Sequence, residues 1–308
     1  MNHPTLAKRN ATPYALAVTG VLFASICFGF VPYFSRGLTD QGLAPYAVAF
    51  YRYILAAIVL LPALLLHRSK WREILWGLFA GAVMSLGWVG YVTALKTVPA
   101  STVGVLYMTY PVFTIAIAWA LFGDYPTRRS LVAAGLIIIA AIIAGSPASV
   151  PLEQVPTLIV SLAAPLGFGF AICVLVHRLS RIATLARIAS ISLGGVIGLS
   201  PLILSSEVGE VLPKSGNDWF LIVGIGLMTA LIPQLIYTVC SPIIGATRTA
   251  VVGSIELPTM FAVGVLAFGE VITGGQALAC ALVLGAIALT QSRSTRTVTT
   301  VISKTPER

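Results

Sequence analysis

Long apolar stretches separated by short polar segments run through almost the whole chain. Each stretch is about 20 residues long, which is the length an α-helix needs to cross the hydrocarbon core of a bilayer. The stretches of the first half lie near 14–35, 44–66, 72–95, 99–121 and 128–146. Those of the second half lie near 155–176, 183–205, 218–241, 246–268 and 271–291. The pattern therefore predicts an all-α integral membrane protein with ten transmembrane helices.

A short motif occurs once in each half. Tyr110-Pro111 leads to Phe122-Gly123-Asp124, and Leu257-Pro258 leads to Phe268-Gly269-Glu270. Five helices are an odd number, so a second copy would enter the membrane from the opposite side, as in inverted-repeat transporters. We expect a tail at 1–13, a first repeat at 14–146, an external linker at 147–154, a second repeat at 155–291 and a basic tail at 292–308.

The distribution of charge supports this division. If both termini are cytoplasmic, 15 of the 19 Lys and Arg residues fall in cytoplasmic segments. This is the distribution that the positive-inside rule predicts. Apolar residues make up 57% of the chain and charged residues 9%, which is too apolar for a water-soluble domain. The net charge of +9 is thus explained by membrane orientation, and no nucleic-acid partner is needed.

These segments resemble the EamA domain of the drug/metabolite transporter superfamily. Phe28-Gly29 with Arg36, the stretch from Pro45 to Arg52-Tyr53, and above all Glu256-Leu257-Pro258 through Gly269-Glu270 resemble that domain over nearly the whole chain. The first copy departs from it in having Asp124 where Glu is usual, and Thr109 where the last copy has Glu256.

The chain looks most like the bacterial YddG-type amino-acid exporters. The resemblance implies a multi-pass protein of the bacterial cell inner membrane, with a central cavity lined by helices 1, 3, 4, 6, 8 and 9. The expected partners are a small-molecule substrate, the lipid bilayer and, as a candidate coupling ion, the proton. The sequence leaves the oligomeric state open, and a monomer is compatible with it.

Aromatic and polar residues at helical spacing are the candidate cavity lining. They are Met84, Trp88 and Tyr91 in the third helix, Tyr107 and Tyr110 in the fourth, and Gln234 and Tyr237 in the eighth. Such side chains suit a small zwitterion, because aromatic faces attract an ammonium group and stack on rings. The alternative for each is helix packing or an interfacial aromatic belt.

Two charged residues fall inside predicted spans. Glu256, about eight residues into the ninth helix, is a candidate proton site, substrate-ammonium partner or ion-pair member. Alternatively it accepts backbone donors freed by a kink at Pro258. Arg52 could hold a substrate carboxylate through its planar fork, or extend toward the interface.

Other repeated features have structural interpretations. Pro111 and Pro258 occupy similar places in the two copies and are candidate hinges for gating. Asp124 and Glu270 precede the fifth and tenth helices, where carboxylates would cap the amino-terminal amides. Gly77 with Gly81 and Gly194 with Gly198 would allow close helix packing. The four cysteines lack metal-ligand spacing and are expected to be free thiols.

The sequence therefore predicts a secondary transporter that exports small metabolites, foremost aromatic and other neutral amino acids, by alternating access. A sugar-phosphate or nucleotide-sugar carrier of the same superfamily, a channel and a non-transporting membrane subunit remain alternatives. The chain has no ATP-binding P-loop motif, no H-E-x-x-H or G-x-S-x-G motif and no metal-spaced His/Cys set. We accordingly expect no enzyme activity, no cofactor and no metal.

Overall fold

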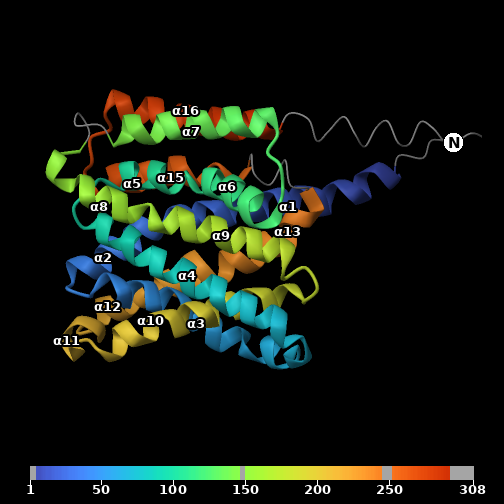
Figure 1. The fold of residues 1–308 in the computed structure, drawn as a ribbon, viewed down its shortest axis with the longest axis horizontal. Coiled ribbons are helices and arrows are strands. Elements are labelled where there is room, and N and C mark those ends of the chain that lie inside the picture. The colour runs from blue at the N-terminus through green and yellow to red at the C-terminus, as the bar shows by residue number, and fades with distance from the viewer. Residues whose placement is uncertain (1–4, 146–149, 245–251, 292–308) are drawn as a thin grey trace, which may run out of the picture.

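Helices form all of the regular secondary structure in the described part of the computed structural model, residues 5–145, 150–244 and 252–291 (Figure 1). In chain order the α-helices of the first half are α1 (Thr5–Gly29), α2 (Val31–Asp40), α3 (Pro45–Leu65), α4 (Trp71–Leu95), α5 (Ala100–Tyr107), α6 (Tyr110–Phe122) and α7 (Arg128–Ala144). Those of the second half are α8 (Val155–Ser161), α9 (Ala163–His177), α10 (Thr184–Leu204), α11 (Val208–Val211), α12 (Gly216–Gly226), α13 (Ile232–Ile244), α15 (Glu256–Phe268) and α16 (Gly274–Gln291). The short segments η1 (Arg68–Lys70) and η2 (Leu152–Gln154) are 3₁₀ turns, and η3 (Leu227–Leu231) is a π-helical turn.

Seven helical segments are long and apolar enough to cross a membrane, which makes this a membrane protein. They are Tyr14–Asp40, Pro45–Leu65, Trp71–Leu95, Ala100–Phe122, Leu152–His177, Thr184–Leu204 and Gly216–Cys240. Glu256–Phe268 and Gly274–Leu289 are shorter apolar helices. Every predicted stretch overlaps a described helix, although 246–251 of the ninth lie outside the described residues. Ten crossings, their inverted relation, the domain division and the cytoplasmic termini stay predictions.

Several stretches that were predicted as single helices are interrupted, and a proline follows each interruption. The breaks lie at Phe30, at Met108–Thr109, at Leu162, at the π turn η3 and at Ser254–Ile255. The following prolines are Pro32, Pro111, Pro165, Pro233 and Pro258. Proline lacks an amide hydrogen and clashes with the carbonyl four residues earlier, so the helix is interrupted just upstream.

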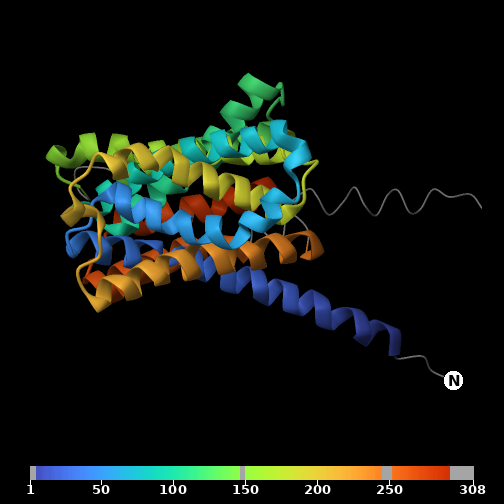
Figure 2. The same cartoon turned by 90° about the horizontal axis from the view of Figure 1, so that it is seen from below.

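The helices pack side by side in a bundle, with α7 and α16 paired along one edge (Figure 1). The amino-terminal part of α1 projects beyond the bundle, as Figure 2 shows. Glu270 lies at one end of the bundle, with the starts of α5 and α16, and we call this the Glu270 end. Asp124 lies with His177 at the opposite end of these helices, which we call the Asp124 end.

Small residues allow the close contact of α4 with α10, as the sequence predicted. A Cβ atom on Gly81 would overlap the Ile191 carbonyl oxygen, and one on Gly194 would overlap that of Leu78. Gly77 and Gly198 face Ser190 and Ala82 in the same contact. The contact fixes α4, which carries Met84 and Trp88, against α10.

Candidate functional site

A cavity of about 180 Å³ lies among α3, α4, α5, α9, α10, η3 and α13. Its polar and charged lining residues are Arg52, Tyr53, Tyr107, Thr184, Arg187, Ser192, Thr229, Gln234 and Thr238. Most of the other lining residues are apolar, among them Met84, Trp88 and Phe168. Size and lining suit a small amphipathic ligand.

The helices around this cavity differ from those that the family resemblance implied. The second and seventh predicted helices, α3 and α10, line it, whereas the first and ninth do not. The physical reason is a close contact of α1 with α15: a Cβ atom on Gly29 would lie 2.5 Å from Cβ of Thr259 and 2.9 Å from the Glu256 carbonyl oxygen. The helices α1 and α15 are therefore packed closely at this point, and the cavity lies between α3, α4, α9 and α10.

Arg52 is held in the wall of the cavity by two contacts. Its guanidinium carbon lies 3.8 Å from the ring centre of Trp88, a cation–π arrangement. Its Nη2 donates a hydrogen bond of 3.3 Å to the carbonyl oxygen of Thr229 in η3. Its Nη1 is buried and donates to no described residue. The hydroxyl of the neighbouring Tyr53 is also buried and has no described hydrogen-bond partner. Arg52 therefore keeps unused hydrogen-bonding capacity beside the cavity.

The ring of Trp88 that contacts Arg52 belongs to a cluster of aromatic side chains. The ring of Trp88 lies 4.7 Å from that of Tyr91 and 5.4 Å from that of Tyr107, centre to centre. The Tyr107 ring lies 5.8 Å from Phe168. Tyr91 is 1% exposed and does not line the cavity, and its ring packs against those of Trp88 and Tyr107. The cluster holds the Trp88 ring in position under the guanidinium.

The predicted cavity residues thus divide into two groups. Met84, Trp88, Tyr107, Gln234 and Arg52 line the cavity. The predicted residues that do not line it are Tyr91, Tyr110, Tyr237 and Glu256. Tyr110 packs on Phe168 at 5.0 Å, and Tyr237 on Phe28 at 6.1 Å.

Glu256 was predicted about eight residues into a helix that begins near 246, and residues 246–251 lie outside the described residues. Glu256 is the first residue of α15, directly after the break at Ser254–Ile255. None of the described residues forms a hydrogen bond or ion pair with its carboxylate. The carboxylate of Glu256 and the guanidinium of Arg52 are near enough for their charges to interact, but they form no direct ion pair.

The helix bounds also revise the comparison of the two copies. Both α6 and α15 have 13 residues, and both end at a glycine in the left-handed region, Gly123 and Gly269. Counted back from these glycines, Glu256 matches Tyr110, whereas counted from the prolines it matches Thr109. Pro111 is the second residue of α6 and Pro258 the third of α15, so both lie in a first turn, where proline costs no helical hydrogen bond.

Asp124 and Glu270 do not cap the helices that follow them, which corrects the sequence prediction. Thr127 caps α7 by accepting from Ser130 N at 3.2 Å, and Thr273 caps α16 by accepting from Gln276 N at 3.2 Å. Asp124 instead contacts His177 Nε2 at 2.9 Å. Hydroxyl side chains three residues upstream satisfy the amides, so the carboxylates are free to bind across the bundle.

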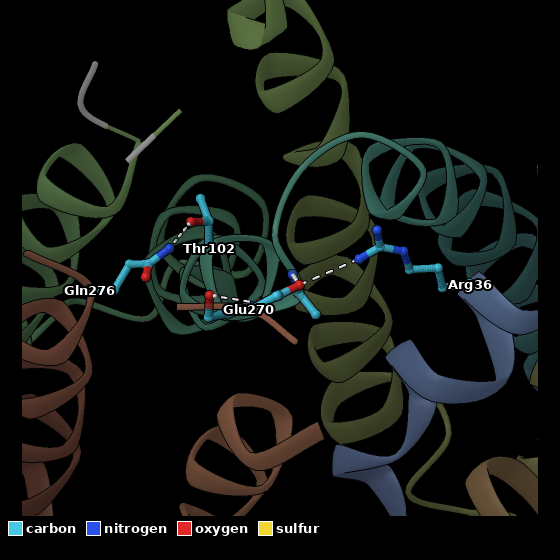
Figure 3. A network of polar contacts seen from close by, with 6 residues as sticks. Arg36, Thr102, Glu270 and Gln276 are labelled. Atoms are coloured by element: carbon cyan, nitrogen blue, oxygen red, sulfur yellow. Dashed lines mark hydrogen bonds and ion pairs between the residues drawn. The ribbon is translucent and has the colours of Figure 1, made fainter. Parts of the chain in front are cut away.

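Glu270 caps a helix of the other half, α5 (Figure 3). It accepts from Ala100 N at 2.6 Å and from Ser101 N at 3.2 Å, and Arg36 of α2 lies 3.5 Å away. Gln276 Nε2 donates to Thr102 Oγ1 at 2.9 Å beside these contacts. We call this set of contacts the Glu270 network. It joins α2, α5 and α16 at the Glu270 end.

Sequence reasoning missed Arg187, Tyr53 and Thr229 as lining residues. Tyr53 follows Arg52 in the stretch that resembles the EamA domain, but it was not predicted to line a cavity. Arg187 was assigned to a basic cytoplasmic segment. The four cysteines are free thiols, as predicted, and Cys27 and Cys173 are buried. The described residues contain no group of His, Cys, Asp and Glu that could hold a metal ion.

The fold is that of a helical membrane protein with an internal cavity. Residues 15–146 match the EamA-like transporter family. An uncharacterized transporter of Synechocystis sp. is 27% identical over 241 residues, which cover 73% of this chain and 72% of that one. The first half of the chain is thus similar to the EamA-like transporter family of the drug/metabolite transporter superfamily, and both findings indicate a transporter rather than an enzyme.

One solved crystal structure of a protein has the same fold. It aligns with a TM-score of 0.60 over 92% of this chain and 98% of its own. Sequence identity is 16%, so this likeness concerns the fold alone.

Proposed function

We propose that the chain is a secondary transporter that exports small metabolites, foremost aromatic and other neutral amino acids, across the bacterial inner membrane. The family match supports transport, and the cavity supports the substrate class. In this proposal the cavity is exposed alternately to the two faces of the membrane, and ten helices form two inverted repeats. The matched bounds and glycine ends of α6 and α15 support the repeat.

One observation carries the substrate assignment, namely the guanidinium of Arg52 stacked on Trp88 in the wall of the cavity. A planar guanidinium binds a carboxylate through paired hydrogen bonds. The rings of Trp88, Tyr107 and Phe168 offer faces for an apolar or aromatic side chain. These are the two parts that every neutral amino acid with an apolar side chain presents.

Counterflow in proteoliposomes tests this proposal. Vesicles containing the purified full chain are loaded with unlabelled phenylalanine, and uptake of labelled phenylalanine from outside is measured. We expect transient accumulation that exceeds that of empty vesicles and is lost in Arg52→Gln. A carrier accelerates exchange because one site is exposed in turn to both sides, whereas a channel does not. Wild-type vesicles that show no counterflow with any amino acid would refute the proposal.

A further inference from the structure

The charges of the cavity wall are all of one sign. Arg52 and Arg187 are the charged residues that line it, and none of the described lining residues is acidic. Glu256 lies outside the lining. An apolar cavity with two cations in its wall attracts anionic groups and disfavours cations.

Arg187 is held in a fixed orientation at the Asp124 end. Its Nε donates to the Ile182 carbonyl oxygen at 2.8 Å, and its Nη2 donates to that of Ser180 at 2.8 Å. Its Nη1 donates to no described residue. The side chain is only partly buried and lies in the first turn of α10, where the cavity reaches the end of the bundle. The guanidinium is thus preoriented, with one nitrogen available to a ligand.

Arg52 lies deeper in the bundle than Arg187, because its neighbour Tyr53 packs farther along α10. Tyr53, next to Arg52, packs its ring against Gly195 of α10, where an added Cβ would lie 2.9 Å from the ring. Gly195 is eight residues after Arg187 on the same helix, which corresponds to roughly 12 Å along its axis. The two guanidinium groups therefore mark the outer and inner parts of one cavity.

We propose that Arg187 and Arg52 are two successive binding sites for the carboxylate of the substrate, Arg187 at the mouth of the cavity and Arg52 at its inner end. This inference rests on the proposed function and sharpens it: the carboxylate is the group that is recognised, and the ammonium group is dispensable. Recognised ligands are organic acids with an apolar or aromatic body, amino acids among them. The corresponding amides and amines are excluded, because they leave the guanidinium groups without an anionic partner.

Binding of four related compounds to the purified full chain separates these requirements. Calorimetric titrations use phenylalanine, 3-phenylpropanoate, phenylalaninamide and phenethylamine, and phenyl phosphate serves as a second anion. We expect the two carboxylates to bind and the amide and amine to bind at least about tenfold more weakly. Arg52→Gln weakens carboxylate binding by about tenfold or more, and Arg187→Gln by about threefold to tenfold.

Two further variants control for structure and charge. Arg181→Gln removes a cation from the same loop region outside the lining and should leave all affinities unchanged. Arg187→Lys keeps the charge and should restore part of the lost affinity. A melting temperature measured for each variant shows whether the fold is intact.

The outcomes are distinct. Equal binding of the amine and the acid, or equal losses for all ligands in Arg187→Gln, overturns the inference and leaves Arg187 as a support of the loop. Binding of 3-phenylpropanoate but not phenylalanine supports the inference and refutes amino acids as substrates. Stronger binding of phenyl phosphate than of either carboxylate overturns the carboxylate assignment in favour of phosphate esters.

Discussion

Arg52 shows how a single charge can be accommodated within an apolar bundle. Moving a cation out of water is costly unless polar groups replace its hydration. Here the π face of Trp88 and the Thr229 carbonyl replace part of it. The hydration of Nη1 is not replaced, because this atom has no described hydrogen-bond partner. A ligand carboxylate would supply the missing partner, so binding and stability should be linked at this residue.

Glu256 is the residue for which a coupling role can be tested directly. Its carboxylate has no described partner, and its charge interacts with that of Arg52 beside the cavity. We expect Glu256→Gln to lower transport driven by a pH gradient about tenfold or more, because the amide cannot bind and release a proton. Initial rates of labelled amino-acid transport in proteoliposomes, measured over a range of pH, provide the test.

The matched control is Asp40→Asn, which removes an exposed carboxylate at the end of α2. It should transport at the rate of the wild type. If Glu256→Gln keeps both the rate and the pH dependence of the wild type, Glu256 has no part in coupling.

At the scale of the helices, the Glu270 network joins segments that are far apart in the sequence. Glu270 supplies acceptors to two backbone amides of α5, and Arg36 lies over the Phe268 ring at 4.6 Å. The acid of the other motif, Asp124, has an exposed side chain and contacts His177. Among the described residues, Glu270 therefore joins more segments than Asp124 does.

Loss of this network should destabilise the protein measurably. Glu270→Ala leaves the α5 amides and Arg36 without their acceptor, and we expect it to cost about 2 kcal/mol of unfolding free energy. Asp124→Ala removes an exposed partner and should cost less than about 1 kcal/mol. Thermal melting of both variants in detergent measures the difference. Equal melting temperatures would show that the network contributes little.

The sequence predicts helices well where their causes are local. Apolar length and polar ends placed α4 at 72–95 and α10 at 183–205, against Trp71–Leu95 and Thr184–Leu204 in the structure. Contacts between distant segments were not predictable in this way. Neither the Glu270 contact with α5 nor the place of Arg187 on the cavity wall follows from its neighbours in sequence. The same limit explains why Tyr110 and Tyr237 were expected in a cavity that they do not line.

At the scale of the whole molecule, the cavity and the Glu270 network lie at different levels along the helices of the bundle. The cavity extends from Arg52 to the first turn of α10 at the Asp124 end, whereas the network joins α2, α5 and α16 at the other end. In the transport cycle that we propose, this arrangement would be the state in which the substrate enters from the Asp124 end. If both termini are cytoplasmic, this end faces the cytoplasm, where an exporter takes up its substrate.

Thiol labelling in intact cells tests this orientation. Ser180→Cys places a thiol in the exposed loop before α10 at the Asp124 end, and Asn217→Cys places one in the first turn of α12 at the other end. Both are made in a chain whose four native cysteines are replaced by serine or alanine. We expect a membrane-impermeant maleimide to label Asn217→Cys in intact cells and Ser180→Cys only after the membrane is permeabilised. Counterflow by each variant shows that the fold is kept. The reverse labelling pattern would place the mouth of the cavity outside the cell and would reverse the proposed direction of transport.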